Sequence, residues 1–307
     1  MELRHLRYFV AVAEEGSLTR AAERLGIQQP PLGQQIRALE SEIGVQLFDR
    51  RSRRIVLNSA GAVFLEDARA ILARAQEATE HIRRFDQGEN GNLKIGLTSS
   101  ASLHTLVPRL LRRFHQTYPL VKIEVTESET YELILGLQRQ RIDVALLRIA
   151  PDRFPELGSI IVAEEDMVVA IPVGHSLAKP RRRSMALRML DEQPLVVYRR
   201  PDGPGIFEGI SDAFAHAGIR PRIVDDVYRL IAAINLVAAG RGLTLVPASM
   251  QILHREAIVY RPLARGALPP LAMHVAYRRD TKLALIRNFL SMTKALASVD
   301  TGRPHGS

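Results

Sequence analysis

No cysteine occurs among the 307 residues, which excludes disulfides, thiolate metal sites and catalysis by a cysteine nucleophile. No uninterrupted apolar run approaches the length of a membrane span. The amino terminus lacks the basic start and apolar core of an export signal, since Glu2, Arg4 and Arg7 fit an amphipathic helix. We therefore expect a cytoplasmic protein that has no membrane partner.

Sequence signatures of catalysis are also missing. GxSxG, HExxH, Walker A and glycine-rich dinucleotide motifs do not occur, and the nine histidines show no metal-ligand spacing. Acidic runs stand at 164–166 and 225–226, but neighbouring side chains on a strand point to opposite faces. We interpret these acids as solvated ends or cleft edges. The sequence thus predicts no enzyme, no metal site and no cofactor.

The length and the 46% content of hydrophobic residues allow two or more domains with substantial cores. Lysine and arginine outnumber acids by 42 to 33, a net charge of +9 that favours polyanionic partners. In residues 1–60 there are nine arginines, no lysines and seven acids, and four of the arginines lie within 50–54. The positive charge of this region is therefore concentrated in one short segment.

Residues 16–44 have the pattern of two short helices joined by a tight turn. Ser17 suits the N-cap of the first helix, and Gly26 suits its left-handed end. Pro30 or Pro31 suits the opening turn of the second helix, where a missing N–H costs nothing. This layout predicts a helix-turn-helix.

The second helix has an apolar stripe and a polar face. Leu32, Ile36, Leu39 and Ile43 recur at steps of four, three and four, so they predict one buried face. The surface expected to cover it is formed by Leu6, Phe9, Val10, Ala21, Ala22 and Leu25. The glutamines and Arg37 on the other face have the bidentate geometry that reads base edges in a major groove. An ordinary solvated helix face is the alternative.

The four clustered arginines precede a strand-forming run, 55–57, and together they predict the wing of a winged helix-turn-helix. Guanidinium groups there would neutralise phosphates without reading sequence. A solvated loop is the alternative. The predicted DNA contacts are Ser17, Thr19, Gln28, Gln29, Pro30, Pro31, Gly33, Gln34, Gln35, Arg37, Arg50, Arg51, Arg53 and Arg54.

Residues 59–85 show a heptad pattern. Phe64, Ile71, Ala78 and Phe85 recur every seven residues, and an apolar row at 68, 75 and 82 follows at the same interval. This pattern indicates a coiled-coil dimerisation helix, with a core helix of a single chain as the alternative. Residues 87–92, rich in glycine, asparagine and charge, are expected to form a hinge.

From residue 93 onward, strand patterns alternate with helix patterns, which favours parallel sheets with helical crossovers. We expect two lobes, with the chain leaving the first near Val162 and returning near Pro269. A cleft between the lobes would collect strand ends and helix N-termini, where small anions bind. The expected strands are 93–98, 121–127, 143–148, 167–172, 195–198, 222–227, 243–246 and 271–277, and the expected helices are 102–117, 130–139, 205–216, 228–239 and 281–297.

The first sixty or so residues resemble the DNA-binding domain of the LysR-type transcriptional regulators. The matching segments are 3–9, 16–22, 29–32, 36–40, 44–50 and 57–61. Two positions depart from the family pattern: Gln28 and Gly33 stand where members often carry serine or threonine. The resemblance implies a homodimer paired by the linker helix, and tetramers built as pairs of dimers. It leaves RNA polymerase open as a further partner.

The later region is similar to the periplasmic-binding-protein-like effector domain of the same family. Residues 240–249 carry this similarity best, and 237–240 with 246–250 resemble the subgroup of catechol, benzoate and chlorocatechol regulators. That likeness implies a small organic acid as effector, either an aromatic acid or a muconate-like dicarboxylate, and a role in aromatic catabolism.

Candidate effector contacts lie where predicted strands end. Hydroxyls and amides at Thr98, Ser99 and Ser100 could hold a carboxylate, and the family contacts its effector at this segment. Arg148 could add a charge-assisted contact. Helix caps and surface ion pairing are the alternatives for these residues. The other candidates are Ser128, Thr130, Val227 and, where the family has its second cleft loop, Pro201, Gly203 and Pro204.

The sequence therefore predicts an α/β protein with three parts and a tail. A winged helix-turn-helix would cover 1–58, a dimerisation helix 59–87, and a two-lobed effector domain 88–299, with lobe I at about 92–162 and 269–299 and lobe II at about 163–268. Residues 300–307 would form a tail. The expected function is a regulator that binds double-stranded DNA at an inverted repeat and responds to an effector. The alternatives are a solute-binding receptor with an accessory domain, which the missing export signal disfavours, and an enzyme under local control.

Overall fold

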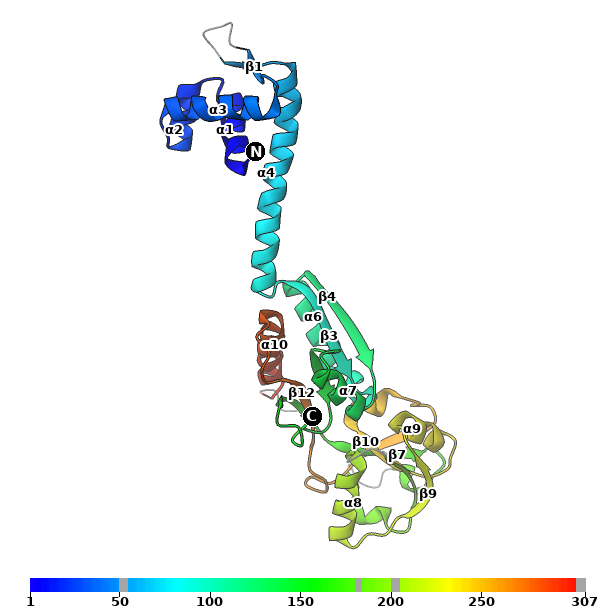
Figure 1. Ribbon diagram of the computed structural model, residues 1–307. Helices are drawn as coiled ribbons and strands as arrows, with labels where there is room; N and C mark the ends of the chain where they lie inside the picture. Colours follow the sequence, from blue (N-terminus) through cyan, green and yellow to red (C-terminus); the bar gives the residue numbers. More distant parts are fainter. Residues whose placement is uncertain (50–54, 180–183, 200–204, 302–307) are drawn as a thin grey trace. The chain divides into compact units, whose positions relative to one another are not determined.

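The computed structural model describes residues 1–49, 55–179, 184–199 and 205–301. The chain divides into two compact units, Met1–Arg84 and Phe85–Ser307, here called the N-terminal and C-terminal units (Figure 1). Among the helices of the described residues, none combines the length and the apolar character that crossing a membrane requires.

The N-terminal unit is a three-helix cluster followed by a small hairpin and a long helix (Figure 1). Its core joins Leu6 and Phe9 of the first helix to Leu32 and Leu39 of the third and to Ala68 of the long helix. The antiparallel pairing of β1 with β2 confirms the predicted wing hairpin. The elements are α1 (Leu3–Glu15), α2 (Leu18–Leu25), α3 (Gln29–Ile43), β1 (Phe48–Asp49), β2 (Val56–Leu57) and α4 (Ser59–Asp86).

Gly61 fixes the junction between the hairpin and α4. A Cβ at this position would lie 2.0 Å from the carbonyl oxygen of Leu47 and 2.8 Å from the side chain of Leu57. Only glycine allows α4 to begin this close to the backbone before β1. The Asn58 side chain completes the junction, since its Oδ1 accepts from the Gly61 amide at 2.8 Å and its Nδ2 donates to the Gln46 carbonyl at 2.8 Å.

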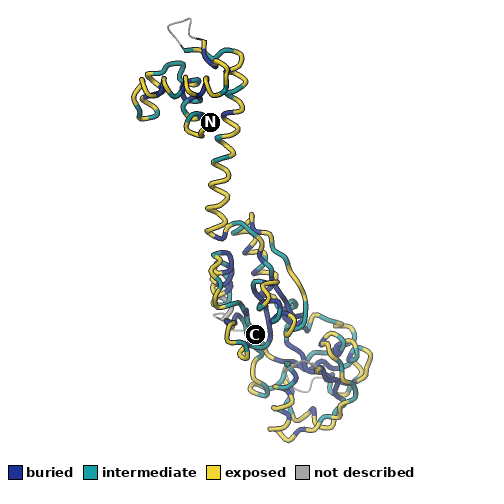
Figure 2. The backbone as a smooth tube through the Cα atoms, in the orientation of Figure 1, coloured by how far each residue is buried: buried dark blue, intermediate teal, exposed yellow. Residues whose placement is uncertain are grey.

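The predicted heptad row of α4 lies partly in the core of the N-terminal unit and partly on the solvent-exposed surface. Phe64 is half-buried and Ala68 fully buried in the core of the N-terminal unit, so the start of the row packs within its own chain, which corrects the expectation of one continuous seam. Beyond this point the helix is largely exposed (Figure 2). Ile71, Ile82 and Phe85 are 39%, 61% and 51% exposed. Apolar side chains on a solvated helix face indicate a surface available to a partner.

The first lobe of the C-terminal unit is a five-stranded sheet in the order β4-β3-β5-β12-β6. Helices α6 and α10 contribute to the core on one face, where Phe114 meets Phe289 edge-on, and α7 covers the other face. The elements are β3 (Asn90–Leu97), α5 (Ser99–Ser102), α6 (Leu106–Thr117), β4 (Leu120–Glu127), α7 (Thr130–Gln138), β5 (Val144–Leu147), β6 (Leu157–Glu165), β12 (Leu271–Arg278) and α10 (Ala284–Thr301).

The second lobe contains the sheet β10-β7-β11 and the parallel pair β8-β9, joined by a bridge between Leu195 and Leu243. Helices α8 and α9 pack on these strands around one apolar core. The elements are β7 (Met167–Pro172), η1 (Ser176–Ala178), η2 (Leu187–Leu190), β8 (Pro194–Tyr198), α8 (Ile206–Ala217), β9 (Arg222–Val227), α9 (Leu230–Ala238), β10 (Thr244–Pro247), η3 (Ala248–Ile252) and β11 (Ile258–Pro262).

Several expectations for this unit need correction. The five-stranded sheet is mixed rather than parallel, because β12 runs antiparallel to β5 and β6. The sheet β10-β7-β11 is antiparallel throughout. Strands β6 and β11 were not predicted, and since β6 continues to Glu165 the first crossing between lobes lies after Val162. The expected hinge is partly strand, because β3 begins at Asn90. The C-terminal helix spans Ala284–Thr301 where 281–297 was expected, so it continues past the expected domain end at 299; residues 302–307 of the predicted tail lie outside the described residues.

Candidate functional site

The turn between α2 and α3 has the predicted caps. The Ser17 hydroxyl accepts from the Arg20 amide at 3.4 Å, and Gly26 ends α2 with a left-handed φ of 66°. Pro30 and Pro31 stand in the opening turn of α3, where they leave no N–H unsatisfied. Thr19 links the two helices, because its hydroxyl donates to Oε1 of Gln29 at 3.1 Å. Each cap lies where its residue type is stabilising, so local sequence determines this turn.

Helix α3 buries its apolar stripe as predicted. Leu32, Ile36 and Leu39 are at most 3% exposed, while Ile43 is half-buried against the same core. The opposite face is open to solvent: Gln34 and Arg37 are exposed, and Gln35 is half-exposed. The remaining predicted contact residues of this segment are also exposed, except Gly33, which is half-buried: Gln28, Gln29, Pro30 and Pro31. Arg50, Arg51, Arg53 and Arg54 of the predicted wing lie outside the described residues.

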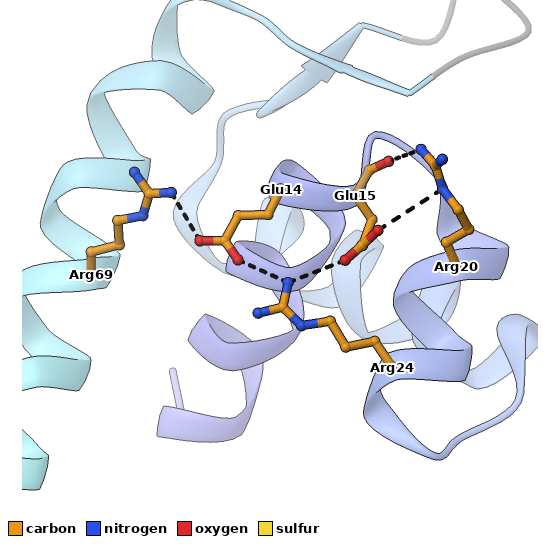
Figure 3. Close-up of polar contacts among 5 residues, drawn as sticks. All are labelled: Glu14, Glu15, Arg20, Arg24 and Arg69. Carbon is orange, nitrogen blue, oxygen red and sulfur yellow. Dashed lines mark hydrogen bonds and ion pairs between the residues drawn. The ribbon is translucent and has the colours of Figure 1, made fainter.

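A chain of ion pairs joins α1, α2 and α4 behind this face (Figure 3). Nη1 of Arg24 lies 2.9 Å from Glu14 and 3.2 Å from Glu15, and Nη2 of Arg69 lies 2.9 Å from Glu14. Nε of Arg20 lies 3.9 Å from Glu15, whose carbonyl accepts from the same guanidinium. The hydrogen bond from Arg69, and then that from Arg24, lower the pKa of Glu14. The cluster connects the helix-turn-helix to α4.

Glu40 positions the base of the wing. Its side chain is buried, and Oε1 accepts from the amides of Leu47 and Phe48 at 2.9 and 3.3 Å. The carboxylate thus ties α3 to the start of β1. Sequence reasoning placed Glu40 in a family-like segment but assigned it no role, because a pattern of residues does not show which backbone amides a side chain will bond.

The C-terminal unit holds a cleft of about 330 Å³ whose walls come from both lobes. Strands β4, β5 and β8 end at it, and helices α7, α8 and α9 begin at it. This is the arrangement expected for a ligand site in a two-lobed α/β protein. The lining residues are Ser99, Ser100, Glu127, Glu129, Thr130, Arg148, Ile149, Tyr198, Gly205, Ile206, Tyr228, Arg229, Leu230, Ile231, Ala232 and Asn235.

Four predicted effector residues, Ser99, Ser100, Thr130 and Arg148, therefore lie together at this cleft. Three others are not on its described wall. The Thr98 hydroxyl is fully buried and has no hydrogen-bond partner in the ranges that the structure describes. The Ser128 amide donates to the Leu97 carbonyl at 3.1 Å, and Val227 pairs with Tyr198 in the β8-β9 ladder. Pro201, Gly203 and Pro204 lie outside the described residues.

Arg148 is buried rather than paired at the surface. Its side chain is 3% exposed and forms an ion pair with Glu165, which is 9% exposed. Nη2 also donates to the Ser100 carbonyl at 2.9 Å, whereas Nε and Nη1 have no hydrogen-bond partner among the described residues. Burial lowers the pKa of Arg148, and Glu165 opposes this effect. Buried donors without a partner are rare in folded proteins, so these two nitrogens are a distinctive feature of the cleft wall.

Glu165 also contacts the second lobe. Its carboxylate accepts from the Ser249 amide at 2.6 Å and from the Ser249 hydroxyl at 3.0 Å. Of the two expectations for the run 164–166, a solvated end or a cleft edge, the solvated end is therefore wrong for Glu165, which lies against the cleft residue Arg148. The other acidic run lies on β9, where Asp225 pairs with Arg241 at 3.1 Å and Asp226 with Arg199 at 3.1 Å.

Sequence reasoning did not select the acidic and aromatic side chains that line the cleft. Oε1 of Glu127 accepts from the Ser99 hydroxyl at 2.5 Å, and Oε1 of Glu129 lies 4.0 Å from Nε of Arg229. The signal was available, because both acids flank Ser128, which was selected, at the end of a predicted strand. Tyr198 is a fixed wall residue: burial raises the pKa of its phenol, which donates to the Leu245 carbonyl at 2.8 Å. Within the ranges that the structure describes, no group of three or more His, Asp or Glu side chains is placed to hold a metal.

Two family comparisons cover nearly the whole chain. Residues 3–62 match the family described as "Bacterial regulatory helix-turn-helix protein, lysR family", and residues 86–298 match the "LysR substrate binding domain".

Individual proteins agree with this assignment. The chain is 36% identical over 292 residues to the HTH-type transcriptional regulator BudR of Raoultella terrigena, covering 95% of this chain and 100% of BudR. The crystal structure of CbnR, a LysR family transcriptional regulator, matches with a TM-score of 0.86 at 31% identity, over 95% of this chain and 100% of CbnR. Full-length CbnR in complex with its target DNA matches with a TM-score of 0.84 at 31% identity, over 97% of this chain and 100% of that one.

Proposed function

The chain belongs to the LysR family of DNA-binding transcriptional regulators, and from this premise we propose that it binds an inverted repeat in promoter DNA and responds to a small organic acid. The proteins to which it is similar are regulators, so the enzymatic alternative is set aside. We place its action in the cytoplasm, where promoter DNA and RNA polymerase, its further proposed partner, are present.

The exposed polar face of α3 carries the DNA part of the proposal. Gln34 and Arg37 project from a helix whose other side is anchored by Leu32 and Leu39, so their positions are fixed before DNA binds. Such side chains can form bidentate hydrogen bonds with base edges in the major groove. The arginines at 50–54 are proposed to bind phosphates beside the helix.

The exposed row on α4 supports a dimer. Ile71, Ala78, Ile82 and Phe85 share one helix face, and all four are exposed in the described chain. Pairing of this face with that of a second copy would bury it and carry two α3 helices to successive major grooves. Tetramers would then form as pairs of dimers, as the family resemblance implies.

A gel-shift titration of the full chain on the DNA upstream of its own gene tests this part. We expect a shifted complex on a duplex with two inverted half-sites and binding at least about tenfold weaker on one half-site, because the dimer then loses half of its base contacts. Affinity should fall steeply with salt as counterions are released. Absence of any complex would instead favour the solute-binding receptor.

The cleft is the proposed effector site. Ser99, Ser100 and Thr130 offer hydroxyls and helix-start amides, and Arg148 offers two buried donors without a partner. These groups suit a carboxylate, and apolar residues such as Ile149 and Leu230 suit an aromatic or hydrocarbon body. The likeness to catechol, benzoate and chlorocatechol regulators favours an aromatic acid or a dicarboxylate, and hence a role in aromatic catabolism.

Replacing both Ser99 and Ser100 by alanine should remove the effector response while leaving basal DNA binding unchanged. A thermal-shift screen of aromatic and dicarboxylic acids measures this, because a ligand that binds only the folded state raises the Tm with its concentration. Ser211→Ala, on the exposed surface of α8, is the control. A normal response of the double variant would show that the site lies elsewhere.

Regulation by this cleft requires differential affinity. An effector changes the DNA-bound arrangement of a dimer only as far as it binds one arrangement more tightly than the other. Because Glu165 and Ser249 connect the lobes beside Arg148, a ligand that engages Arg148 would act on the contact that sets the two lobes relative to each other.

A further inference from the structure

The cleft walls carry acids as well as cations, and we propose that the effector is a zwitterion, with an ammonium group in addition to its carboxylate. The inference rests on the proposed function, since it assumes that the effector binds in this cleft. It refines the ligand class: an amino acid or a similar compound rather than a simple organic acid.

The balance of charge at the cleft supports this proposal. Glu165 already neutralises the buried Arg148 through their ion pair. Of the other described lining residues, Glu127 and Glu129 are acidic and Arg229 alone is basic. The described wall therefore has one negative charge in excess. A simple carboxylate would add a second negative charge to a partly desolvated site, whereas a zwitterion adds none.

The charges of opposite sign also occupy different places. Arg148 lines the cleft, and its buried Nε and Nη1 have no acceptor within the described part of the chain, so the proposed carboxylate is assigned to this end of the cleft. The carboxylate of Glu127 lies 2.5 Å from the Ser99 hydroxyl at the end of β4. A ligand whose carboxylate also reached Ser99 would meet this acid, unless a cationic group of the ligand lay against it.

Glu129 and Arg229 face each other from the two lobes. Their closest charged atoms are 4.0 Å apart, which is a weak pair, and both residues immediately precede helices that begin at the cleft. A zwitterion can bind both side chains at once, with its ammonium group near Glu129 and its carboxylate near Arg229 or Arg148. A simple acid can replace only one half of this pair.

The first test compares matched ligands by thermal shift on the full chain. One set is phenylalanine, phenylpropanoate and phenylethylamine, and a second set is leucine, isocaproate and isoamylamine. Within each set the body is the same and the charges differ. We expect at least one amino acid to raise the Tm more than both of its singly charged analogues do.

An acid that raises the Tm as much as its amino acid does, or a panel in which no amino acid raises it, would overturn the zwitterion proposal. The proposed function is tested separately, because DNA binding in the gel shift and stabilisation by simple acids do not depend on the ammonium group. A response to acids alone would therefore keep the regulator and reject the zwitterion.

The second test uses two variants of α7. Glu129→Gln removes the acid at the cleft, whereas Glu132→Gln makes the same charge change one turn further along, at an exposed position off the cleft wall. We expect Glu129→Gln to weaken amino acid binding about tenfold without weakening acid binding, and Glu132→Gln to change neither. Equal effects of the two variants, or a parallel loss of acid and amino acid binding, would contradict the proposal. Basal Tm and DNA binding show that each variant is folded.

Discussion

The two units present their binding groups in opposite ways. In the N-terminal unit, the candidate DNA contacts of α3 fall within ten consecutive positions, 28–37, and lie on the surface of one helix. In the C-terminal unit, the cleft residues run from Ser99 to Asn235 and come from both lobes. The first site depends on local sequence, and the second depends on strand pairing between distant segments. Mutations of the exposed α3 side chains should therefore change function alone, whereas mutation of the buried Arg148–Glu165 pair should also change stability.

The largest effect is expected at the buried ion pair of the C-terminal unit. Glu165→Ala leaves Arg148 buried without its partner, and loss of one member of a buried pair costs about 3–5 kcal/mol of unfolding free energy. Denaturant unfolding followed by circular dichroism measures this loss.

The neighbouring Glu164 provides the control for this prediction. It is exposed, so Glu164→Ala should change stability by less than about 0.5 kcal/mol. Similar losses of unfolding free energy in the two variants would mean that the Arg148–Glu165 pair stabilises the protein no more than a surface acid does. The C-terminal unit would then not differ from the N-terminal unit in this respect.

A smaller effect, on function alone, is expected at α3. Gln34→Ala should relax base preference by about 1–3 kcal/mol at one position of each half-site if Gln34 reads a base, with stability unchanged within about 0.5 kcal/mol. Competition gel shifts with single-base variants of the half-site measure the preference.

Gln76→Ala, on the exposed surface of α4, is the matched control and should leave base preference as it is. Uniform weakening on every sequence by Gln34→Ala would reassign Gln34 to a phosphate contact. A large loss of stability in Gln34→Ala would instead mean that this face of α3, like the cleft, depends on packing for its structure.

The smallest effect is expected from Glu14, at the centre of the exposed ion-pair chain. Because Arg69 and Arg24 lower its pKa below the ordinary 4.5, folding favours the ionised form. Its contribution is fully present above the unfolded value and is lost as pH falls through the lower folded value. Glu14→Gln should thus cost less than about 1 kcal/mol near neutral pH, and nothing in strong acid.

Thermal unfolding of the full chain between neutral pH and pH about 3 would show this convergence. Glu23→Gln, an exposed acid on α2 with no part in the chain of ion pairs shown in Figure 3, is the control and should be neutral throughout. If the Tm difference between Glu14→Gln and the unchanged protein grew toward low pH, folding would have to raise the pKa of Glu14. That result would contradict the lowered pKa.

The same contrast explains what the sequence could and could not predict. The caps at Ser17 and Gly26 and the stripe through Leu32 and Leu39 follow local rules, and all were predicted. The Arg148–Glu165 pair was not, because it requires β6 and its antiparallel partner β12, which come from segments more than 100 residues apart. Alternating strand and helix patterns do not report strand direction, so parallel sheets were assumed. Buried charge likewise cannot be recognised before the partner strand is known.

The position of β12 also has a consequence for synthesis on the ribosome. This strand is the neighbour of both β5 and β6, yet it is translated only after the whole second lobe. Until it emerges, β5 lacks a hydrogen-bonding partner along one edge and the edge strand β6 has no strand partner in the sheet, so the nascent first lobe cannot close its sheet. The inserted lobe can form its own core during that interval. We therefore expect the later-encoded lobe to reach its native packing first, with the earlier one completed by the last strand to leave the exit tunnel.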